Sequence, residues 1–146
     1  MLSYSFGLLK PDCYQRRLTK MVMKMISKVD LYFVVVKTLK LTRKEIECIY
    51  YDIIDDWYFE DHAKFMESGP VTVFIVRGDY AIQKLNELVG YNIPSQSASR
   101  TIRRFGTNIS RNLIHSSSDF IHFVREAQTI FNGPEFDHLY QREYYL

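Results

Sequence analysis

The sequence predicts an α/β protein in which an antiparallel sheet is covered by helices. Short runs with the two-residue alternation of strands recur along the chain, and amphipathic helical stretches lie between them. No internal repeat, linker or low-complexity block divides the 146 residues. The order strand, helix, strand, helix, strand, helix, strand, helix therefore predicts one α/β sandwich domain over residues 1–146. The ferredoxin-like βαββαβ sandwich is one such arrangement.

The strands are predicted from apolar runs and from the residues that interrupt them. Tyr4, Phe6 and Leu8 share one face of the first run, and Pro11 ends it because proline cannot donate to a strand ladder. Ser68-Gly69-Pro70 separates a helix from the third run. We expect strands at residues 3–9, 31–41, 71–76 and 112–116.

The helices are predicted from apolar residues at helical spacing and from capping residues. Thr42 and Glu45 form a capping box, Asp79 is a candidate N-cap, and Gly90 suits a helix end. Ser117-Ser118-Asp119 is a strong helix start. We expect helices at residues 15–29, 42–54, 59–66, 79–89 and 120–131.

Residues 91–110 have little periodicity and are predicted to be mostly loop. A loop of this length within a compact domain is usually functional. Arg100, Arg103, Arg104 and Arg111 crowd this region without an acidic neighbour. They are either a solvated surface or a site for a polyphosphate, because each guanidinium presents a planar fork of donors to phosphate oxygens.

Composition excludes several classes of function. The net charge of +2 is too small to indicate bulk attraction to nucleic acid or membranes. No apolar run approaches the roughly 20 residues of a membrane span, and the first residues lack the pattern of a signal peptide. The two cysteines show no metal or redox spacing. We expect a soluble cytoplasmic protein with reduced cysteines.

Two single residues are candidates for chemistry, and each is weak alone. Lys10 ends the first strand in Leu-Leu-Lys-Pro-Asp; it is either a solvated lysine or a point charge for a phosphate. His115 lies in Asn-Leu-Ile-His-Ser-Ser-Ser, where a histidine satisfied near the core is the commoner case.

The combination of motifs is more specific. Lys-Pro-Asp, Ser-Gly-Pro, Thr-Ile-Arg and Asn-x-x-His-x-Ser occur in that order, with Glu126 eleven residues after His115. This pattern resembles the nucleoside diphosphate kinase family over nearly the whole chain. The resemblance implies that the γ-phosphoryl group of a nucleoside triphosphate is passed to a nucleoside diphosphate through a phosphohistidine, with ping-pong kinetics. It implies synthesis of GTP, UTP and CTP.

The resemblance also implies roles for individual residues. His115 matches the phosphorylated histidine, Glu126 the carboxylate that orients it, and Ser117 the serine between them. Tyr58 falls where the family stacks a phenylalanine on the base, and His62 where an apolar residue lines the base pocket. The remaining positions implied to contact phosphates or ribose are Lys10, Tyr50, Asn86, Asn92, Arg103 and Asn112.

Phosphoryl-transfer chemistry is consistent with these roles. A free imidazole of pKa about 6.5 is about three-quarters neutral at pH 7, so its nitrogen is available for attack. A carboxylate on the other nitrogen fixes the tautomer. Because no acidic cluster indicates a protein-only metal site, we expect Mg²⁺ to arrive on the nucleotide.

The sequence departs from the family pattern around the phosphates. Asn86 stands where the family has a second phosphate-binding arginine, and Asn92 where it usually has threonine. Ser99 and Arg100 replace a glycine-containing turn. Arg100 or Arg104 is a candidate to supply the missing charge.

Two alternatives to a working kinase remain at this point. One is a nucleotide-binding or scaffolding member of the same fold with weak catalysis. The other is a nucleic-acid-binding sandwich, which lacks a specific sheet motif. The resemblance further implies a homo-oligomer. The aromatic tail is a candidate packing segment and includes Phe136, Tyr140, Tyr144 and Tyr145.

Overall fold

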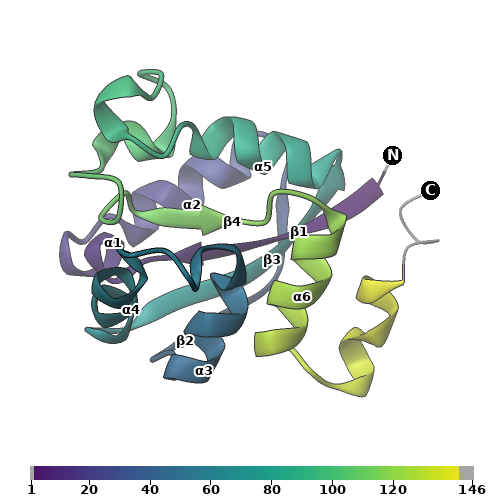
Figure 1. The fold of residues 1–146 in the computed structure, drawn as a ribbon. Coiled ribbons are helices and arrows are strands. Elements are labelled where there is room, and N and C mark those ends of the chain that lie inside the picture. The colour runs from purple at the N-terminus through teal and green to yellow at the C-terminus, as the bar shows by residue number, and fades with distance from the viewer. Residues whose placement is uncertain (1, 142–146) are drawn as a thin grey trace.

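A computed structural model describes residues 2–141 and contains one four-stranded antiparallel sheet (Figure 1). The strands are β1 (Leu2–Leu9), β2 (Tyr32–Leu39), β3 (Val71–Asp79) and β4 (Ile114–Ser116). They lie in the order β2-β3-β1-β4, so β2 and β4 are the edges. This order and the helices packed on the sheet confirm the predicted ferredoxin-like sandwich.

Helices cover both faces of this sheet. One face carries α3 (Arg43–Ile49), α4 (Phe59–Glu67) and α6 (Phe120–Ile130), whose apolar residues join Phe6 and Leu8 of β1 in one core. The other face carries α2 (Thr19–Ser27) and α5 (Ala81–Val89) over Phe74 and Val76 of β3. The short elements are α1 (Pro11–Gln15), η1 (Tyr51–Ile53), η2 (Pro94–Gln96), η3 (Ile102–Phe105) and η4 (Pro134–Tyr140).

Two local features of the sheet follow from single residues. A Cβ atom at Gly7 would overlap the ring of Phe74 on the paired strand, so only glycine fits at this close approach. In β2, Val34 is the extra residue of a bulge, because Phe33 pairs with Val76 and Val35 with the adjacent Ile75.

Two of the predicted helices are confirmed in position, and one of them also in its cap. The helix at α4 agrees with the expected residues 59–66, and α6 is capped by Asp119, whose side chain accepts from the His122 amide. The capping box of Thr42 and Glu45 is present at the start of α3. Its helix ends at Ile49 rather than near residue 54, and a 3-10 turn follows.

Other predicted boundaries are wrong. The helix expected at 15–29 begins only at Thr19 and ends at Ser27. A separate short helix, α1, precedes it and ends at Gln15, and Arg17 between the two helices is left-handed, with φ of 58°. Asp79 is not an N-cap: β3 runs on to Asp79, and Tyr80, at φ of 53°, precedes α5. Residues 91–110 are mostly irregular, as predicted, with short 3-10 turns. Tyr144 and Tyr145 lie outside the described residues.

No helix among residues 2–141 is both long enough and apolar enough to cross a bilayer.

Candidate active site

One pocket gathers most of the residues that the sequence singled out. It opens between the α4 region and the loop before β4, and His115 of β4 lies in its wall. The residues that line it are Lys10, Tyr50, Ile53, Trp57, Tyr58, His62, Asn92, Arg103, Ile109, Ser110, Asn112 and His115.

Behind the pocket wall, His115 is held by a buried carboxylate. Its Nε2 lies 2.7 Å from Oε1 of Glu126, and the Ser117 hydroxyl donates to that same oxygen at 2.7 Å. Glu126 on α6 is only 1% exposed. A carboxylate in this position favours the tautomer with the proton on Nε2, which leaves the lone pair on Nδ1. The arrangement therefore leaves Nδ1 of His115 able to form a bond with an electrophile.

The backbone just before His115 is held in an unusual conformation. Leu113 has φ of 79°, which costs of order 1–3 kcal/mol for a residue other than glycine. Its N–H donates to Oδ2 of Asp12 at 3.2 Å, and its carbonyl accepts from the Lys10 amide at 2.8 Å. These two bonds tie the Lys-Pro-Asp segment to the segment that carries His115.

Lys10 is a buried ammonium group at the inner end of the pocket. Its Nζ donates to Oδ1 of Asn112 at 2.8 Å and to the carbonyl of Ser110 at 3.1 Å. Burial and, to a smaller extent, the nearby Arg103 lower the pKa of Lys10 to about 7. A polyphosphate brought next to this group would favour its charged form.

Arg103 is anchored on backbone carbonyls around the same end. Its Nε and Nη2 donate to the Ile114 carbonyl at 3.2 and 3.0 Å, and its Nη1 donates to the Gly90 carbonyl at 3.3 Å. Burial lowers the pKa of Arg103, which still remains a permanent cation. Tyr50 packs beside it, with its ring 5.1 Å from that of His115, and burial raises the pKa of its hydroxyl.

The outer end of the pocket is apolar and more exposed. Trp57 and Tyr58 lie edge to face at 5.7 Å, and Ile109 lines the same pocket from the loop before β4. Trp57 is 91% exposed. The Tyr58 hydroxyl donates to Oδ2 of Asp56 at 2.9 Å. Aromatic faces of this kind can stack on a planar base.

His62 lies between the two ends and is buried. Its ring packs at 4.4 Å against Tyr50, and its Nδ1 lies 3.4 Å from the Ser110 hydroxyl. Burial lowers the pKa of His62 to about 3, so the imidazole is neutral at ordinary pH.

Three polar residues suggested by the sequence are not brought into this pocket. The side chain of Asn86 bonds to the segment after His115 instead of lining the pocket. Arg104 donates to the carbonyls of Ser95 and Ser97, and Arg100 lines a separate groove against α5. The expectation that Arg100 or Arg104 supplies the missing phosphate charge is therefore not supported within one chain.

The comparisons with known proteins agree with this geometry. The family profile described as "Nucleoside diphosphate kinase" matches residues 3–136. The chain belongs to the nucleoside diphosphate kinase family. A relative from Lawsonia intracellularis, named nucleoside diphosphate kinase, is 30% identical over 135 residues, which are 92% of this chain and 98% of the relative.

Solved structures of nucleoside diphosphate kinases have the same fold. A family protein from Babesia bovis superposes with a TM-score of 0.85 and 31% identity, over 91% of this chain and 90% of its own. The enzyme from Halobacterium salinarum, solved in complex with CDP, has a TM-score of 0.87 and 27% identity, over 92% of this chain and 91% of its own. The alternative of a nucleic-acid-binding sandwich has no support from these relatives.

The polar groups at the inner end determine how a metal ion could be held there. Members of the family need a divalent cation, and among residues 2–141 no group of three His, Cys, Asp or Glu side chains could hold one. The inner end offers Lys10, Arg103 and the amide of Asn112, which repel or weakly bind Mg²⁺. These residues fit an ion bound by the nucleotide's own phosphates.

Several residues of the site were not predicted to act in it. Asp12 belongs to the Lys-Pro-Asp motif, which could have indicated a role for its carboxylate. Trp57, Ile53 and Ile109 line the pocket without belonging to any motif. No local pattern indicated Leu113, because its left-handed conformation depends on the tertiary bonds to Asp12 and Lys10.

Proposed function

We propose that this chain transfers the γ-phosphoryl group of a nucleoside triphosphate, typically ATP, to a nucleoside diphosphate through Nδ1 of His115. The observation that carries the proposal is the His115–Glu126 pair at 2.7 Å, at the inner end of a pocket that also contains Lys10 and Arg103. This pair leaves Nδ1 of His115 without a proton, in the same pocket as the cationic side chains of Lys10 and Arg103.

The reaction proceeds in two balanced half-reactions. The Nδ1 lone pair forms a bond to the γ-phosphorus, the bond from phosphorus to the bridging oxygen breaks, and that electron pair leaves with the nucleoside diphosphate. A second nucleoside diphosphate then attacks the phosphohistidine with a terminal oxygen and regenerates His115. The Nε2 proton remains on the nitrogen that faces Glu126, which stabilises the positive charge that develops on the ring.

The surrounding residues position the phosphates. Lys10 and Arg103 present N–H groups to the phosphate oxygens, while Asn112 fixes the Lys10 ammonium and, in this proposal, contacts the ribose. Tyr50 lies beside the phosphates, and Asn92 lines the same pocket, where its carbonyl accepts from the Asn112 amide at 2.9 Å. A bound Mg²⁺ would supply further neutralisation of charge on the phosphates.

The outer end of the pocket accounts for broad acceptance of bases. Tyr58, Trp57 and Ile109 offer flat or apolar contacts, which do not distinguish hydrogen-bonding edges. We therefore expect ATP to donate to GDP, UDP and CDP, so that the enzyme supports synthesis of GTP, UTP and CTP. The CDP complex of the Halobacterium relative is consistent with this expectation.

The test is direct labelling of the protein. Incubation with γ-labelled ATP and Mg²⁺, without an acceptor, should give acid-labile, base-stable label, which a nucleoside diphosphate then removes. His115→Ala should carry no label, whereas His138→Ala, at an exposed histidine outside the pocket, should label like the parent. A folded parent that binds nucleotide but takes no label would overturn the proposal in favour of a binding protein.

We further propose that the chain forms a homo-oligomer through the free edge of β2. The exposed fractions of Tyr32, Val34 and Val36 are 64%, 45% and 42%, which is unusual for a strand at an open edge. Antiparallel pairing of two β2 strands would continue the sheet and bury these side chains. Light scattering should show a multiple of the chain mass, and Val36→Lys should reduce it; a monomeric parent would contradict this proposal.

We also propose that the protein is located in the cytoplasm. This location is supported by the two cysteines, Cys13 and Cys48, which are both free.

A further inference from the structure

We infer that Asn86 is a positioning residue for His115, acting through the segment 116–118 rather than through the nucleotide. The inference rests on the proposed role of His115 as the phosphoryl acceptor. In this inference Asn86, on α5, fixes the backbone that follows His115 and leads to α6, which carries Glu126.

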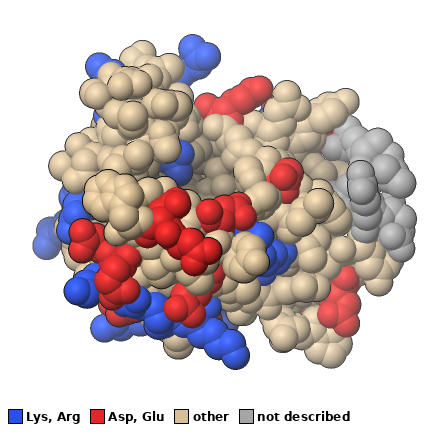
Figure 2. Space-filling model, viewed as in Figure 1, with Lys and Arg blue, Asp and Glu red and all other residues tan. Residues whose placement is uncertain are grey.

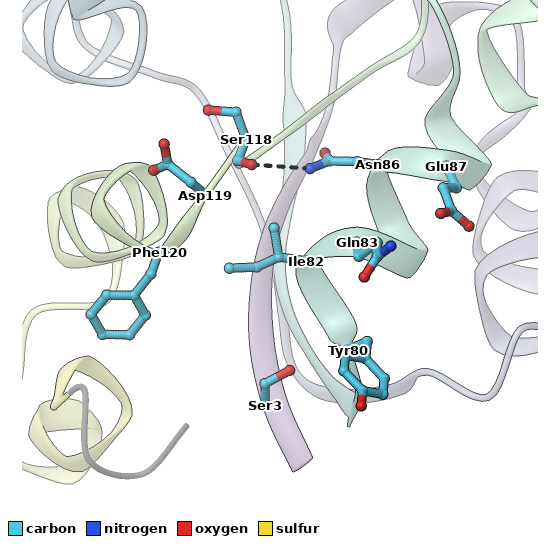
Figure 3. Close-up of a pocket in the computed structure, with 9 residues that line it drawn as sticks. All are labelled: Ser3, Tyr80, Ile82, Gln83, Asn86, Glu87, Ser118, Asp119 and Phe120. Carbon is cyan, nitrogen blue, oxygen red and sulfur yellow. Dashed lines mark hydrogen bonds between the residues drawn. The ribbon is translucent and has the colours of Figure 1, made fainter. Parts of the chain in front are cut away.

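The amide of Asn86 is fully engaged with this segment. Its Nδ2 donates to the carbonyl of Ser117 at 3.1 Å and to that of Ser118 at 3.4 Å. Its Oδ1 accepts from the Ser116 hydroxyl at 2.7 Å. Figure 3 shows the side chain reaching from α5 toward Ser118. Three consecutive residues after His115 are thus tied to one amide.

The same segment orients the catalytic pair. Ser117, whose carbonyl Asn86 holds, directs its hydroxyl to Oε1 of Glu126, the oxygen that also lies 2.7 Å from Nε2 of His115. On the other side, the Ser117 amide donates to the carbonyl of Phe6 in β1. Asn86 therefore completes a frame in which the residues following His115 are fixed from α5, β1 and α6.

The place of Asn86 in the fold argues against direct contact with the nucleotide. It lines a shallow, mostly apolar groove with Tyr80, Ile82 and Phe120, as drawn in Figure 3, and it does not line the pocket of Lys10 and Arg103. Both N–H groups of its amide are used by carbonyls, so no donor remains to face a phosphate. The polar end of this side chain can act on the reaction only through the backbone that it holds.

Two phosphoryl donors separate positioning from nucleotide binding. ATP tests binding and transfer together, whereas phosphoramidate is a small donor with no nucleoside and reports on the reactivity of His115 alone. The variants are Asn86→Ala and a matched control, Gln83→Ala, which removes an exposed amide one turn earlier on α5 in the same groove. The dissociation constant for ADP completes the comparison.

In Asn86→Ala, we expect labelling of His115 by both donors to slow by about tenfold, since one net hydrogen bond is worth roughly that factor. The dissociation constant for ADP should stay within about twofold, and Gln83→Ala should match the parent. Asn86→Asp, which keeps the acceptor for Ser116 but loses both donors, should label as slowly as Asn86→Ala.

Two results would overturn the inference. Unchanged labelling by phosphoramidate with weaker ADP binding would make Asn86 a nucleotide contact, and unchanged values for both would make it a structural link without influence on the reaction. The proposed function fails separately: a parent that phosphoramidate labels but ATP does not would refute the kinase proposal and leave the Asn86 comparison intact.

Discussion

The two ends of the pocket are built in different ways. At the inner end, Lys10, Asn112 and Glu126 are 3%, 1% and 1% exposed, and each is tied to neighbours by hydrogen bonds. At the outer end, Trp57 and Ile109 are 91% and 57% exposed, and their contacts are apolar. The inner end is preorganised for one charged group, whereas the outer end presents surfaces that tolerate different bases.

Charge separates the two ends as well. The segment that carries Trp57 and Tyr58 is acidic: Asp52, Asp55 and Asp56 precede α4, Glu60 and Asp61 lie within it, and all five are exposed. Two of these carboxylates are paired, Glu60 with Arg43 and Asp52 with His122. Figure 2 shows Asp and Glu side chains gathered over this part of the surface. Because like charges repel, a polyphosphate is favoured at the inner, cationic end and the uncharged base at the outer end. We therefore expect charge to orient the nucleotide and stacking to make the site tolerant of different bases.

The largest effect among the variants that keep His115 is expected at Glu126, the buried carboxylate of the inner end. Glu126→Gln keeps the shape but removes the charge that faces Nε2 of His115, so labelling by ATP should slow by about ten- to a hundredfold. The rate is measured in single-turnover labelling experiments. Glu135→Gln, an exposed position, serves as the control. Equal labelling rates in both variants would show that the Glu126 carboxylate does not contribute to the phosphorylation of His115.

The fold was predictable where the signals are local. The capping box at Thr42, the Asp119 cap and the alternation of residues 3–9 each predicted an element that the structure contains. The break at Arg17 and the end of β3 at Asp79 were not predicted, because each lies at a left-handed residue, Arg17 or Tyr80, of a type that rarely adopts this conformation. The helical spacing of apolar residues alone predicted a helix that continues through Arg17.

Those residues of the site that belong to sequence motifs were predictable. Lys10, Arg103, Asn112 and His115 follow from the resemblance, and the structure brings them together. Asn86 shows the limit of that reasoning: its position matched a phosphate contact, but its amide bonds to the Ser117 carbonyl and the Ser116 hydroxyl instead.

Lys10 makes the inner end sensitive to pH. Its pKa is lowered to about 7 in the free site, and only the protonated form attracts phosphate, so affinity should fall as pH rises through about 7. If the bound ammonium stays charged, the dissociation constant for ADP rises about fivefold between about pH 7 and about pH 8.

Calorimetry in buffers of different ionisation enthalpy measures this effect as proton uptake on binding. Lys10→Arg is the matched variant, because a guanidinium stays charged throughout this range. A dissociation constant that does not change with pH in either the parent or the variant would contradict the assignment of this pH dependence to Lys10.

At the outer end, the effect of one side chain should be smaller than at Glu126 and independent of the base. Tyr58→Ala removes one aromatic surface, worth about 0.5–1.5 kcal/mol, so affinity should fall by about two- to tenfold for purines and pyrimidines alike. Trp57, the only tryptophan, contacts Tyr58 at 5.7 Å, and its fluorescence reports binding. Tyr58→Phe keeps the ring and should bind like the parent. A loss confined to one base would show that the phenol, not stacking, makes the contact.

The smallest effect is expected at His62, where the two ends meet. Within the described residues its buried Nε2 has no hydrogen-bond partner, and its Nδ1 has only the 3.4 Å contact with Ser110. A neutral imidazole offers one donor and one acceptor. A nucleotide that forms a hydrogen bond with the unpaired nitrogen should therefore bind more tightly than one that does not. Values of kcat/KM for ADP, GDP, CDP and UDP as acceptors should differ by less than about tenfold in the parent and should converge in His62→Leu. The leucine fills similar space without a polar atom, so a ranking that is unchanged in this variant would assign base selection entirely to the stacking surfaces of the outer end.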